Sequence, residues 1–393
     1  MNDDRLVENL AVAGPAAPPR RALLRPAAAA ALSAAARRLP AALAAAAPAA
    51  TFAQPKGPAA PPLRVGFVYV SPVAGVGWTP QQDAARRELE QALAGRATTT
   101  WVENVPEGPD AERVIRDLVS RGHGLVFATS FGYMEPMLRV AREFPEVAFE
   151  HLSGWKTTPN LAVYNARFYE GRWLAGMVAG RATAANAIGY VAGFPIPEVL
   201  QGINAFTLGA RATNPKAEVR VVWTSAWFDP GRERDAAIAL MGQGAEVLTN
   251  HSDSPAVPIA AQARGRWCVG YHSDMSSHAP SAQLTAVTHH WGDFYTASAR
   301  AVLEGRWRNA ALWGGLREGM VRLAPFGAVV PAGVRQQVAA RQADIVAGRA
   351  HPFGGRLIDN EGRERQSSGM PSDETLAGMN WFVQGVQGKP PGA

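Results

Sequence analysis

Large aromatic side chains follow several short apolar runs of this sequence, in loops that also carry glycine or serine. One such loop runs from Ser71 to Trp78, and another begins with Ser130 and Phe131. Exposed rings in polar loops are costly, whereas offset stacking on a flat solute adds roughly 0.5–1.5 kcal/mol beyond area burial. Trp78, Phe131 and Trp227 are therefore predicted to be stacking platforms. The alternative is that each ring packs locally beneath its own loop.

Other loops of the same kind carry polar groups beside aromatic ones. Phe194 and Trp227 follow two apolar runs in the second half of the chain, and Asp253 and Asp274 follow two more. A loop-end aspartate such as Asp253 could equally cap the helix that follows it. The predicted ligand-binding residues are Ser71, Trp78, Phe131, Phe194, Trp227, Asp253 and Asp274.

The elements that position these loops alternate between strand and helix. Each short apolar run is typical of a parallel strand buried on both faces, and amphipathic segments of helical periodicity separate the runs. The predicted strands of the first half are 65–70, 98–102, 125–129 and 147–150, and those of the second half are 187–192, 219–224, 246–249 and 267–271. This alternation predicts an α/β protein with two doubly wound parallel-sheet lobes. Ligands of such sheets bind beyond the carboxyl ends of the strands, where the aromatic loops lie.

The bulk composition agrees with two lobes and excludes some function classes. The chain has 393 residues, with 47% hydrophobic and 18% charged side chains, which suits two globular lobes rather than one core. Its net charge of +6 falls to +3 without residues 1–53, because 33 basic and 30 acidic side chains remain. No Lys/Arg run of the kind that binds nucleic acid is present. Cys268 is the only cysteine, which excludes an intrachain disulfide and favours a small buried side chain.

The first 53 residues are predicted to be an export signal, followed by a linker at 54–62. Arg20, Arg21 and Arg25 form a positive region, and residues 27–36 form an apolar one. Small residues at Thr51 and Ala53 precede a predicted cleavage before Gln54. The arginine pair also loosely resembles a twin-arginine signal. The mature protein is expected in the periplasm, soluble, monomeric and without a membrane anchor, since no cysteine lies near the cleavage site and no apolar stretch is long enough to span a bilayer.

The chain resembles the basic membrane protein family of ABC-importer substrate-binding proteins, which have the type I periplasmic-binding fold. The similarity covers residues 63–388. Each of its motifs is weak alone, and their order and spacing along the chain make the match specific. The segments that carry it are Val65–Trp78, Ala128–Pro136, Tyr164–Gly171 with Ala175-Gly176, Phe228–Gly231, Ser273–Met275 and Gly315–Val321.

The resemblance implies a non-catalytic protein that holds a purine base or nucleoside and delivers it to an ABC permease. It places Trp78 and Trp227 at the facing stacking positions and makes Asp274 the leading acceptor of ligand hydrogen bonds, with Asp253 a second one. Nucleoside-binding relatives tend to have an acidic residue before the first aromatic, an Asn after it and a Lys in the region of residues 284–291, and this chain has none of these there. The departures favour a bare base such as adenine.

Hinge closure is expected to bring the two lobes onto the ligand. Lobe 1 is predicted to comprise residues 63–165 and 285–316, and lobe 2 residues 166–284 and 317–393. The predicted crossings lie near 163–167, 284–289 and 317–323, so that the hinge has several strands.

The sequence contains no motif that would indicate an enzyme, a metal-binding protein or a transcription regulator. There is no nucleophile elbow, Walker loop or His-Glu-x-x-His pattern, and no cofactor is expected. His289 and His290 could suggest a metal, but adjacent strand residues point to opposite faces. A regulator would need a helix-turn-helix at the N-terminus, which residues 1–60 do not provide. A soluble sensor of the same fold that feeds a chemoreceptor remains the alternative to a transport component.

Overall fold

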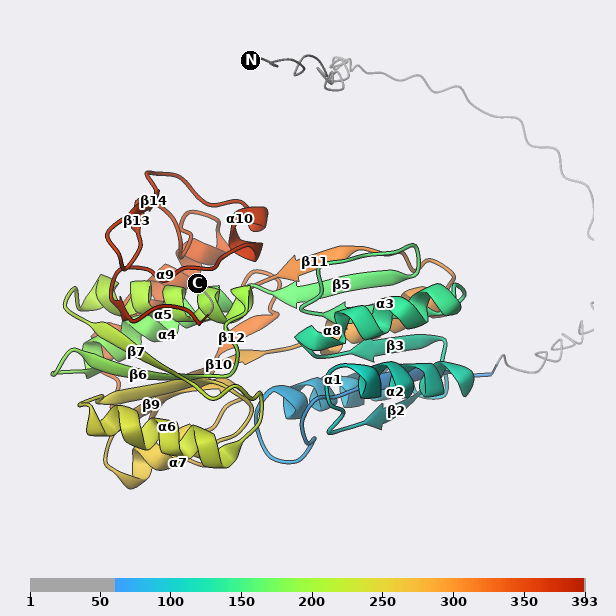
Figure 1. The fold of residues 1–393 in the computed structure, drawn as a ribbon, viewed down its shortest axis with the longest axis horizontal. Helices are drawn as coiled ribbons and strands as arrows, with labels where there is room; N and C mark the ends of the chain where they lie inside the picture. Colours follow the sequence, from blue (N-terminus) through green and yellow to red (C-terminus); the bar gives the residue numbers. More distant parts are fainter. Residues whose placement is uncertain (1–60, 392–393) are drawn as a thin grey trace, which may run out of the picture. The chain divides into compact units, whose positions relative to one another are not determined.

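The computed structural model describes residues 61–391, and the predicted export signal and nearly all of the linker lie outside them. The described residues form one compact unit with two sheets. Each sheet lies between two layers of helices (Figure 1). We call each sheet with its helices a lobe.

Six parallel strands form the sheet of lobe 1, in the order β11-β5-β4-β3-β1-β2. Helices α1 and α8 pack on one face, and α2 and α3 share a separate core with the other face. The bounds are β1 (Leu63–Val68), α1 (Trp78–Ala92), β2 (Ala97–Val102), α2 (Pro109–Ser120), β3 (Leu125–Ala128), the 3₁₀ turn η1 (Phe131–Tyr133), α3 (Met134–Glu143), β4 (Ala148–Leu152), β5 (Leu161–Ala166), α8 (Gly292–Leu303) and β11 (Ala311–Gly314).

Lobe 2 has a seven-stranded sheet in the order β12-β10-β9-β8-β6-β7-β15, in which only β12 is antiparallel to its neighbour. Helices α4 and α5 cover one face, and α6 and α7 the other (Figure 1). The bounds are α4 (Phe168–Ala182), β6 (Ala187–Ala192), α5 (Pro197–Thr213), β7 (Glu218–Trp223), α6 (Pro230–Gly242), β8 (Val247–His251), α7 (Ala256–Ala263), β9 (Trp267–His272), β10 (Gln283–His289), β12 (Val321–Leu323), α9 (Ala332–Val346), β13 (Leu357–Ile358), β14 (Glu364–Gln366), α10 (Asp373–Ala377) and β15 (Val386–Gln387).

The burial of the central strands explains the apolar runs of the sequence. Every residue of β3, β6 and β8 is buried, because helices cover both faces of each sheet. Continuous apolar runs are the pattern that parallel strands of this kind require. The predicted fold class, with two doubly wound lobes, is confirmed.

Glycines allow α4 and α5 to pack in unusually close contact. A Cβ at Gly176 would lie 2.1 Å from the carbonyl oxygen of Phe206, and one at Gly209 would lie 1.9 Å from that of Trp173. Either distance is far shorter than a van der Waals contact. The two helices therefore form a rigid layer behind the sheet that carries the lobe 2 loops.

The chain passes between the lobes three times. It crosses between β5 and α4, between β10 and α8, and between β11 and β12. Strand β10 pairs with β9 along its length, so residues 285–289 belong to the sheet of lobe 2, and the second crossing follows His289. The predicted boundary at 285 is therefore shifted, because an apolar strand does not reveal which sheet it joins. Backbone hydrogen bonds tie the crossings together: Arg167 donates to Gly314 at 2.6 Å, and His290 donates to Met320 at 2.9 Å.

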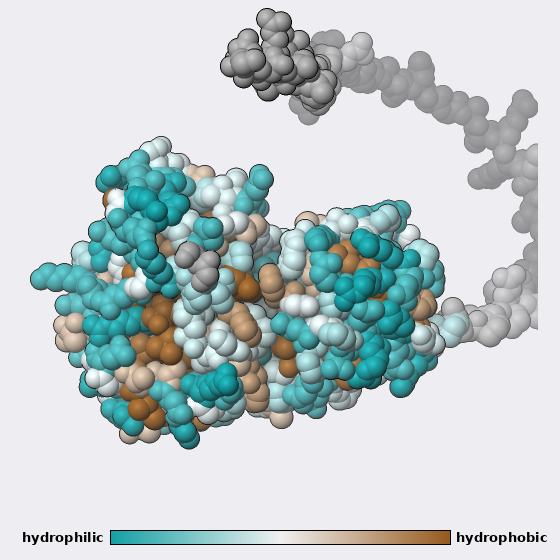
Figure 2. Space-filling view, viewed as in Figure 1, coloured by the Kyte–Doolittle hydropathy of each residue, from teal (hydrophilic) through white to brown (hydrophobic). Residues whose placement is uncertain are grey.

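The C-terminal segment packs on lobe 2 after α9. Leu376, Phe382 and Val386 are buried in the main core, and β15 adds an edge strand beside β7. The surface over β13 and β14 is hydrophilic (Figure 2). Between residues 61 and 391, no helix combines the length and apolarity that crossing a membrane requires.

Candidate functional site

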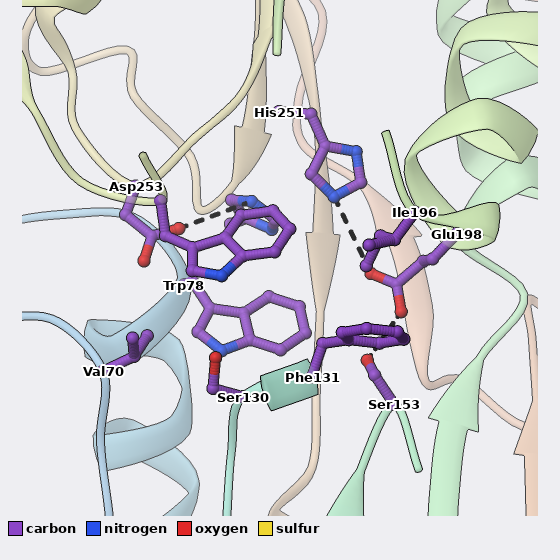
Figure 3. Close-up of a pocket in the computed structure, with 11 residues that line it drawn as sticks. Val70, Trp78, Ser130, Phe131, Ser153, Ile196, Glu198, His251 and Asp253 are labelled. Atoms are coloured by element: carbon purple, nitrogen blue, oxygen red, sulfur yellow. Dashed lines mark hydrogen bonds and ion pairs between the residues drawn. The ribbon is translucent and has the colours of Figure 1, made fainter. Parts of the chain in front are cut away.

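A cavity of about 330 Å³ lies between the lobes at the carboxyl ends of both sheets. Its lining comes from the loops after β1, β3 and β4 in lobe 1 and from β6, β7, β8 and β9 with their loops in lobe 2 (Figure 3). The lining residues are Val70, Trp78, Ser130, Phe131, Ser153, Ile196, Glu198, Trp227, His251, Asp253 and His272.

Trp78 is the first residue of α1 and is held by a hydrogen bond from its ring nitrogen and by packing against neighbouring rings. Its Nε1–H donates to the carbonyl oxygen of Thr129 at 2.7 Å. The rings of His272 and His289 meet it edge-on, with centroids 5.1 and 5.0 Å away. Only 7% of Trp78 is exposed, so the cavity meets a preorganised indole.

Trp227, on the loop after β7, brings a second indole from lobe 2. Phe194 packs edge-on against it, with centroids 4.9 Å apart, and therefore supports the ring without lining the cavity. Gly193 allows this packing, because a Cβ there would lie 2.9 Å from the indole. The Nε1–H of Trp227 donates across the lobes to Glu107 at 3.2 Å.

Phe131 adds a third ring at the start of η1. Its ring lies against Trp155, with centroids 4.7 Å apart and planes inclined by 32°. It is close to Glu198 and Ser153 in the lining (Figure 3). The three predicted platforms therefore line one cavity, and the lobes supply them from both sides.

Asp253 supplies a buried carboxyl from the loop after β8. Its Oδ2 accepts a hydrogen bond from the Ser71 hydroxyl at 2.8 Å, and its Oδ1 lies 3.8 Å from Nε2 of His272. Burial raises the pKa of this carboxyl well above its ordinary value, and the Ser71 hydrogen bond lowers it in part. Ser71 thus lies behind the lining and orients the carboxyl from the opposite lobe.

Glu198 supplies a second carboxyl from the first turn of α5. Its Oε2 accepts from the Ser153 hydroxyl at 2.6 Å and from the Asn165 amide at 3.0 Å, both in lobe 1. Its Oε1 lies 3.7 Å from Nε2 of His251. Burial lowers the pKa of His251, an effect that Glu198 partly opposes.

Direct hydrogen bonds therefore join the lobes around the cavity. Besides the Ser71, Glu107 and Glu198 contacts, the Ser273 hydroxyl accepts from the Gly77 N–H at 3.0 Å and donates to the Gly77 carbonyl at 2.9 Å. These contacts all join residues of lobe 1 to residues of lobe 2.

Asp274 is placed outside the cavity. Its Oδ1 accepts from the backbone N–H of Ser276 at 3.0 Å and from the Gln283 amide at 2.7 Å. These hydrogen bonds outweigh burial and lower the pKa of the carboxyl. The side chain is exposed and stabilises its own turn after β9, which removes it from the set that lines the cavity.

Some lining residues were not among the predicted ligand-binding residues. They are Val70, Ser130, Ser153, Ile196, Glu198, His251 and His272. His251 and His272 end β8 and β9 and share the loops that were singled out for their aspartates. Glu198 follows a strand end at the start of a helix, and this position was a signal that could have identified it. Among residues 61–391, no group of three or more His, Cys, Asp or Glu side chains is arranged to hold a metal ion.

Comparison with known proteins identifies clear relatives. The family model described as "ABC transporter substrate-binding protein PnrA-like" matches residues 63–348. A purine-binding protein of Brucella abortus is 46% identical over 330 residues, 84% of this chain and 94% of that protein. A putative ABC transporter glucose-binding protein of Haloferax volcanii is 37% identical over 84% of this chain and 81% of its own length.

The solved structures agree on the fold. An ABC transporter solute-binding protein from Aeropyrum pernix matches with a TM-score of 0.65 and 16% sequence identity. The match covers 80% of this chain and 95% of that one. At this identity the likeness concerns the fold alone.

Proposed function

This chain belongs to the PnrA-like family of ABC transporter substrate-binding proteins, and from that premise we propose that it captures a purine base for import. In this proposal the base lies between the aromatic rings of the two lobes, and the closed protein delivers it to an ABC permease. The proposal includes export of the chain to the periplasm, where such a protein meets its solute.

One observation carries the proposal: Trp78, Phe131 and Trp227 line a single cavity together with two carboxyls and two imidazoles. Aromatic faces bind flat rings, and a few convergent polar groups fix their orientation. The name of the Brucella relative, a purine-binding protein, agrees with this solute class.

The charge of the cavity lining favours a solute without a phosphate group. No Lys or Arg is among the lining residues described, while Asp253 and Glu198 are. A phosphate group would meet carboxyls without a balancing cation, so nucleotides are disfavoured.

Closure of the lobes follows from the same contacts. The Ser71–Asp253 and Glu107–Trp227 hydrogen bonds join opposite lobes beside the cavity. A solute that contacts both lobes stabilises only the closed arrangement, and this differential affinity shifts the population toward it. The closed form then offers a composite surface to the permease.

A panel of solutes tests the ligand class. The protein, unfolded and refolded to remove any co-purified solute, is titrated with adenine, hypoxanthine, guanine, adenosine, uracil and glucose in a thermal-shift assay and by calorimetry. We expect the purine bases to raise Tm, since a ligand at a hundred times its Kd stabilises by about 2.7 kcal/mol. A flat response to every purine, or a response to glucose alone, would contradict the proposal.

A tryptophan comparison tests the site. Trp227→Ala removes a ring that is only partly buried and should weaken purine binding at least tenfold, because a stacking face is lost. Trp78→Ala should do the same. The control is Trp101→Ala, on the exposed edge strand β2 and 43% exposed, which should leave the affinity unchanged. If Trp227→Ala bound purines as tightly as the wild type, the binding site would have to lie elsewhere.

A further inference from the structure

A line of buried rings leads from the second lobe crossing into the cavity. The Nε1–H of Trp291 donates to Nδ1 of His289 at 2.8 Å, and Nε2 of His289 lies 3.1 Å from Nδ1 of His272. All three residues are buried. Of the three, only His272 lines the cavity.

The donor at one end of this line fixes every proton along it. An indole nitrogen can only donate, so Nδ1 of His289 must accept. Burial lowers the pKa of His289 and of His272 well below the ordinary value, and each ring is therefore neutral with a single N–H. The proton of His289 is then on Nε2 and is donated to Nδ1 of His272. That leaves the proton of His272 on Nε2.

The Nε2–H of His272 is directed to the side of the cavity where Asp253 lies. It lies 3.8 Å from Oδ1 of Asp253, a distance longer than a hydrogen bond. Asp253 itself is anchored through its other oxygen, Oδ2, by Ser71. The Nε2–H donor of His272 and the Oδ1 acceptor of Asp253 thus lie next to each other, and both can form a hydrogen bond to a solute.

The backbone and the neighbouring rings hold His272 in this position. His272 has a φ of 68°, a conformation that non-glycine residues seldom adopt and that clusters at functional sites. The ring of Tyr271 lies 3.9 Å away between centroids, and that of Trp78 meets it edge-on. The donor is therefore preorganised beside the stacking indole, and a bound solute need not order it.

We propose that Trp291 and His289 form a tautomer relay that makes His272 a fixed hydrogen-bond donor, and that His272 and Asp253 together recognise one edge of the bound heterocycle. The recognition step rests on the proposed function. It selects heteroaromatic solutes in which an acceptor ring nitrogen adjoins an N–H donor, as on the amino-substituted edges of adenine. His272 would repel a solute that offers an N–H at the acceptor position. Trp291 and His289 are positioning residues, since neither lines the cavity.

Nitrogen NMR tests the relay without any solute. Full-length protein labelled with ¹⁵N-histidine should show His272 and His289 as neutral Nε2–H tautomers at pH 8 and still at pH 6. Trp291→Phe removes the indole donor but keeps an aromatic ring, and should allow the Nδ1–H tautomer of His289 to appear. A wild-type spectrum with His272 protonated, or with its proton on Nδ1, would overturn the relay. The wild-type measurement decides this even if the variant folds poorly.

Deaza analogues test the recognition. Calorimetry on the wild type with adenine and its 1-, 3- and 7-deaza analogues should reveal one ring nitrogen whose loss costs tenfold or more in affinity. In His272→Ala that analogue and adenine should bind equally. His290→Ala, which alters the adjacent histidine that bonds to Thr288 instead, should keep the difference.

The outcomes separate the two proposals. If no purine binds, the proposed function and this ligand class fail together, while the nitrogen spectrum still decides the relay. If purines bind and every deaza analogue binds as tightly as adenine, or if the difference persists in His272→Ala, the function stands and the recognition by His272 is refuted.

Discussion

At the residue scale, Asp253 makes one of the short polar contacts between the lobes at the cavity, and its buried carboxyl has one hydroxyl partner. That partner, Ser71, belongs to the opposite lobe and lies 2.8 Å from the carboxyl. A second hydroxyl, that of Thr79, lies 2.7 Å from Ser71. A carboxyl without such a partner would be free to rotate toward other donors. The hydroxyls therefore keep it oriented toward the cavity.

Ser71→Ala should lower the affinity for the proposed purine ligand at least about tenfold. The variant removes a hydrogen bond to a carboxyl, of a kind that contributes roughly 1.5–3 kcal/mol, and this bond forms only when the lobes are closed. Calorimetry at pH 7.5 measures the effect. Ser281→Ala, an exposed serine that bonds only to Gln262, is the matched control. Equal affinities of Ser71→Ala and wild type would show that this contact makes no contribution to the closed state.

At the scale of elements, the loop between β1 and α1 sets how closely the lobes approach. Gly77 immediately precedes Trp78, and a Cβ at this position would lie 2.2 Å from the carbonyl oxygen of Asp253. Its φ of 137° is also unfavourable for any other residue. The glycine thus serves both the local turn and the close contact between lobes.

Gly77→Ala should abolish measurable binding while both lobes stay folded, because the added methyl collides with the opposite lobe. Gly75→Ala is the control: its φ of 89° imposes a comparable backbone strain, but its Cβ meets nothing within 4 Å. Small-angle scattering should show Gly77→Ala as more extended in the presence of purine, and Gly75→Ala as compact. Equal affinities of the two variants would show that the clash does not control closure.

At the scale of the whole molecule, buried titratable groups make stability depend on pH. Burial lowers the pKa of His151 to about 3 and those of His290 and His351 to about 4. Such histidines stay neutral in the folded state and take up protons on unfolding, so their contribution to stability is lost as pH falls below about 6.5. The histidines with lowered pKa are His123, His151, His251, His272, His289, His290 and His351.

Four buried acids oppose this trend. Burial raises the pKa of Glu150 to about 7 and also raises those of Glu170, Glu233 and Asp253. These groups are favoured in the protonated form by folding, so their contribution to stability grows as pH falls toward about 4.5. The histidines outnumber these acids, so the net effect is a loss of stability as pH falls.

We therefore expect the free energy of unfolding to fall by at least about 2 kcal/mol between pH 6.5 and 4.5. Urea titrations of the solute-free protein at several pH values measure this. Glu150→Gln removes an opposing group and should make the dependence steeper, whereas His151→Gln should make it shallower. A stability that rises toward pH 4.5 would contradict the prediction.

The sequence alone determined the two-lobed fold and the loops that carry the aromatic rings. Runs such as 187–192 are continuous and apolar because parallel strands are buried on both faces, a requirement that is local and visible in composition. The carboxyl ends of these strands share one edge of the sheet, so Trp78, Phe131 and Trp227 could be assigned to a common region before any coordinates. The family resemblance pointed to the same fold.

Only the tertiary structure decided which polar groups join those rings. Asp274 and Asp253 occupy similar strand-end loops, yet one bonds within its own turn while the other meets Ser71 from 182 positions earlier in the chain. His272 likewise gains its fixed proton from Trp291, through His289. The direction of a side chain depends on the packing of distant elements and on partners from the other lobe, which strand periodicity does not encode.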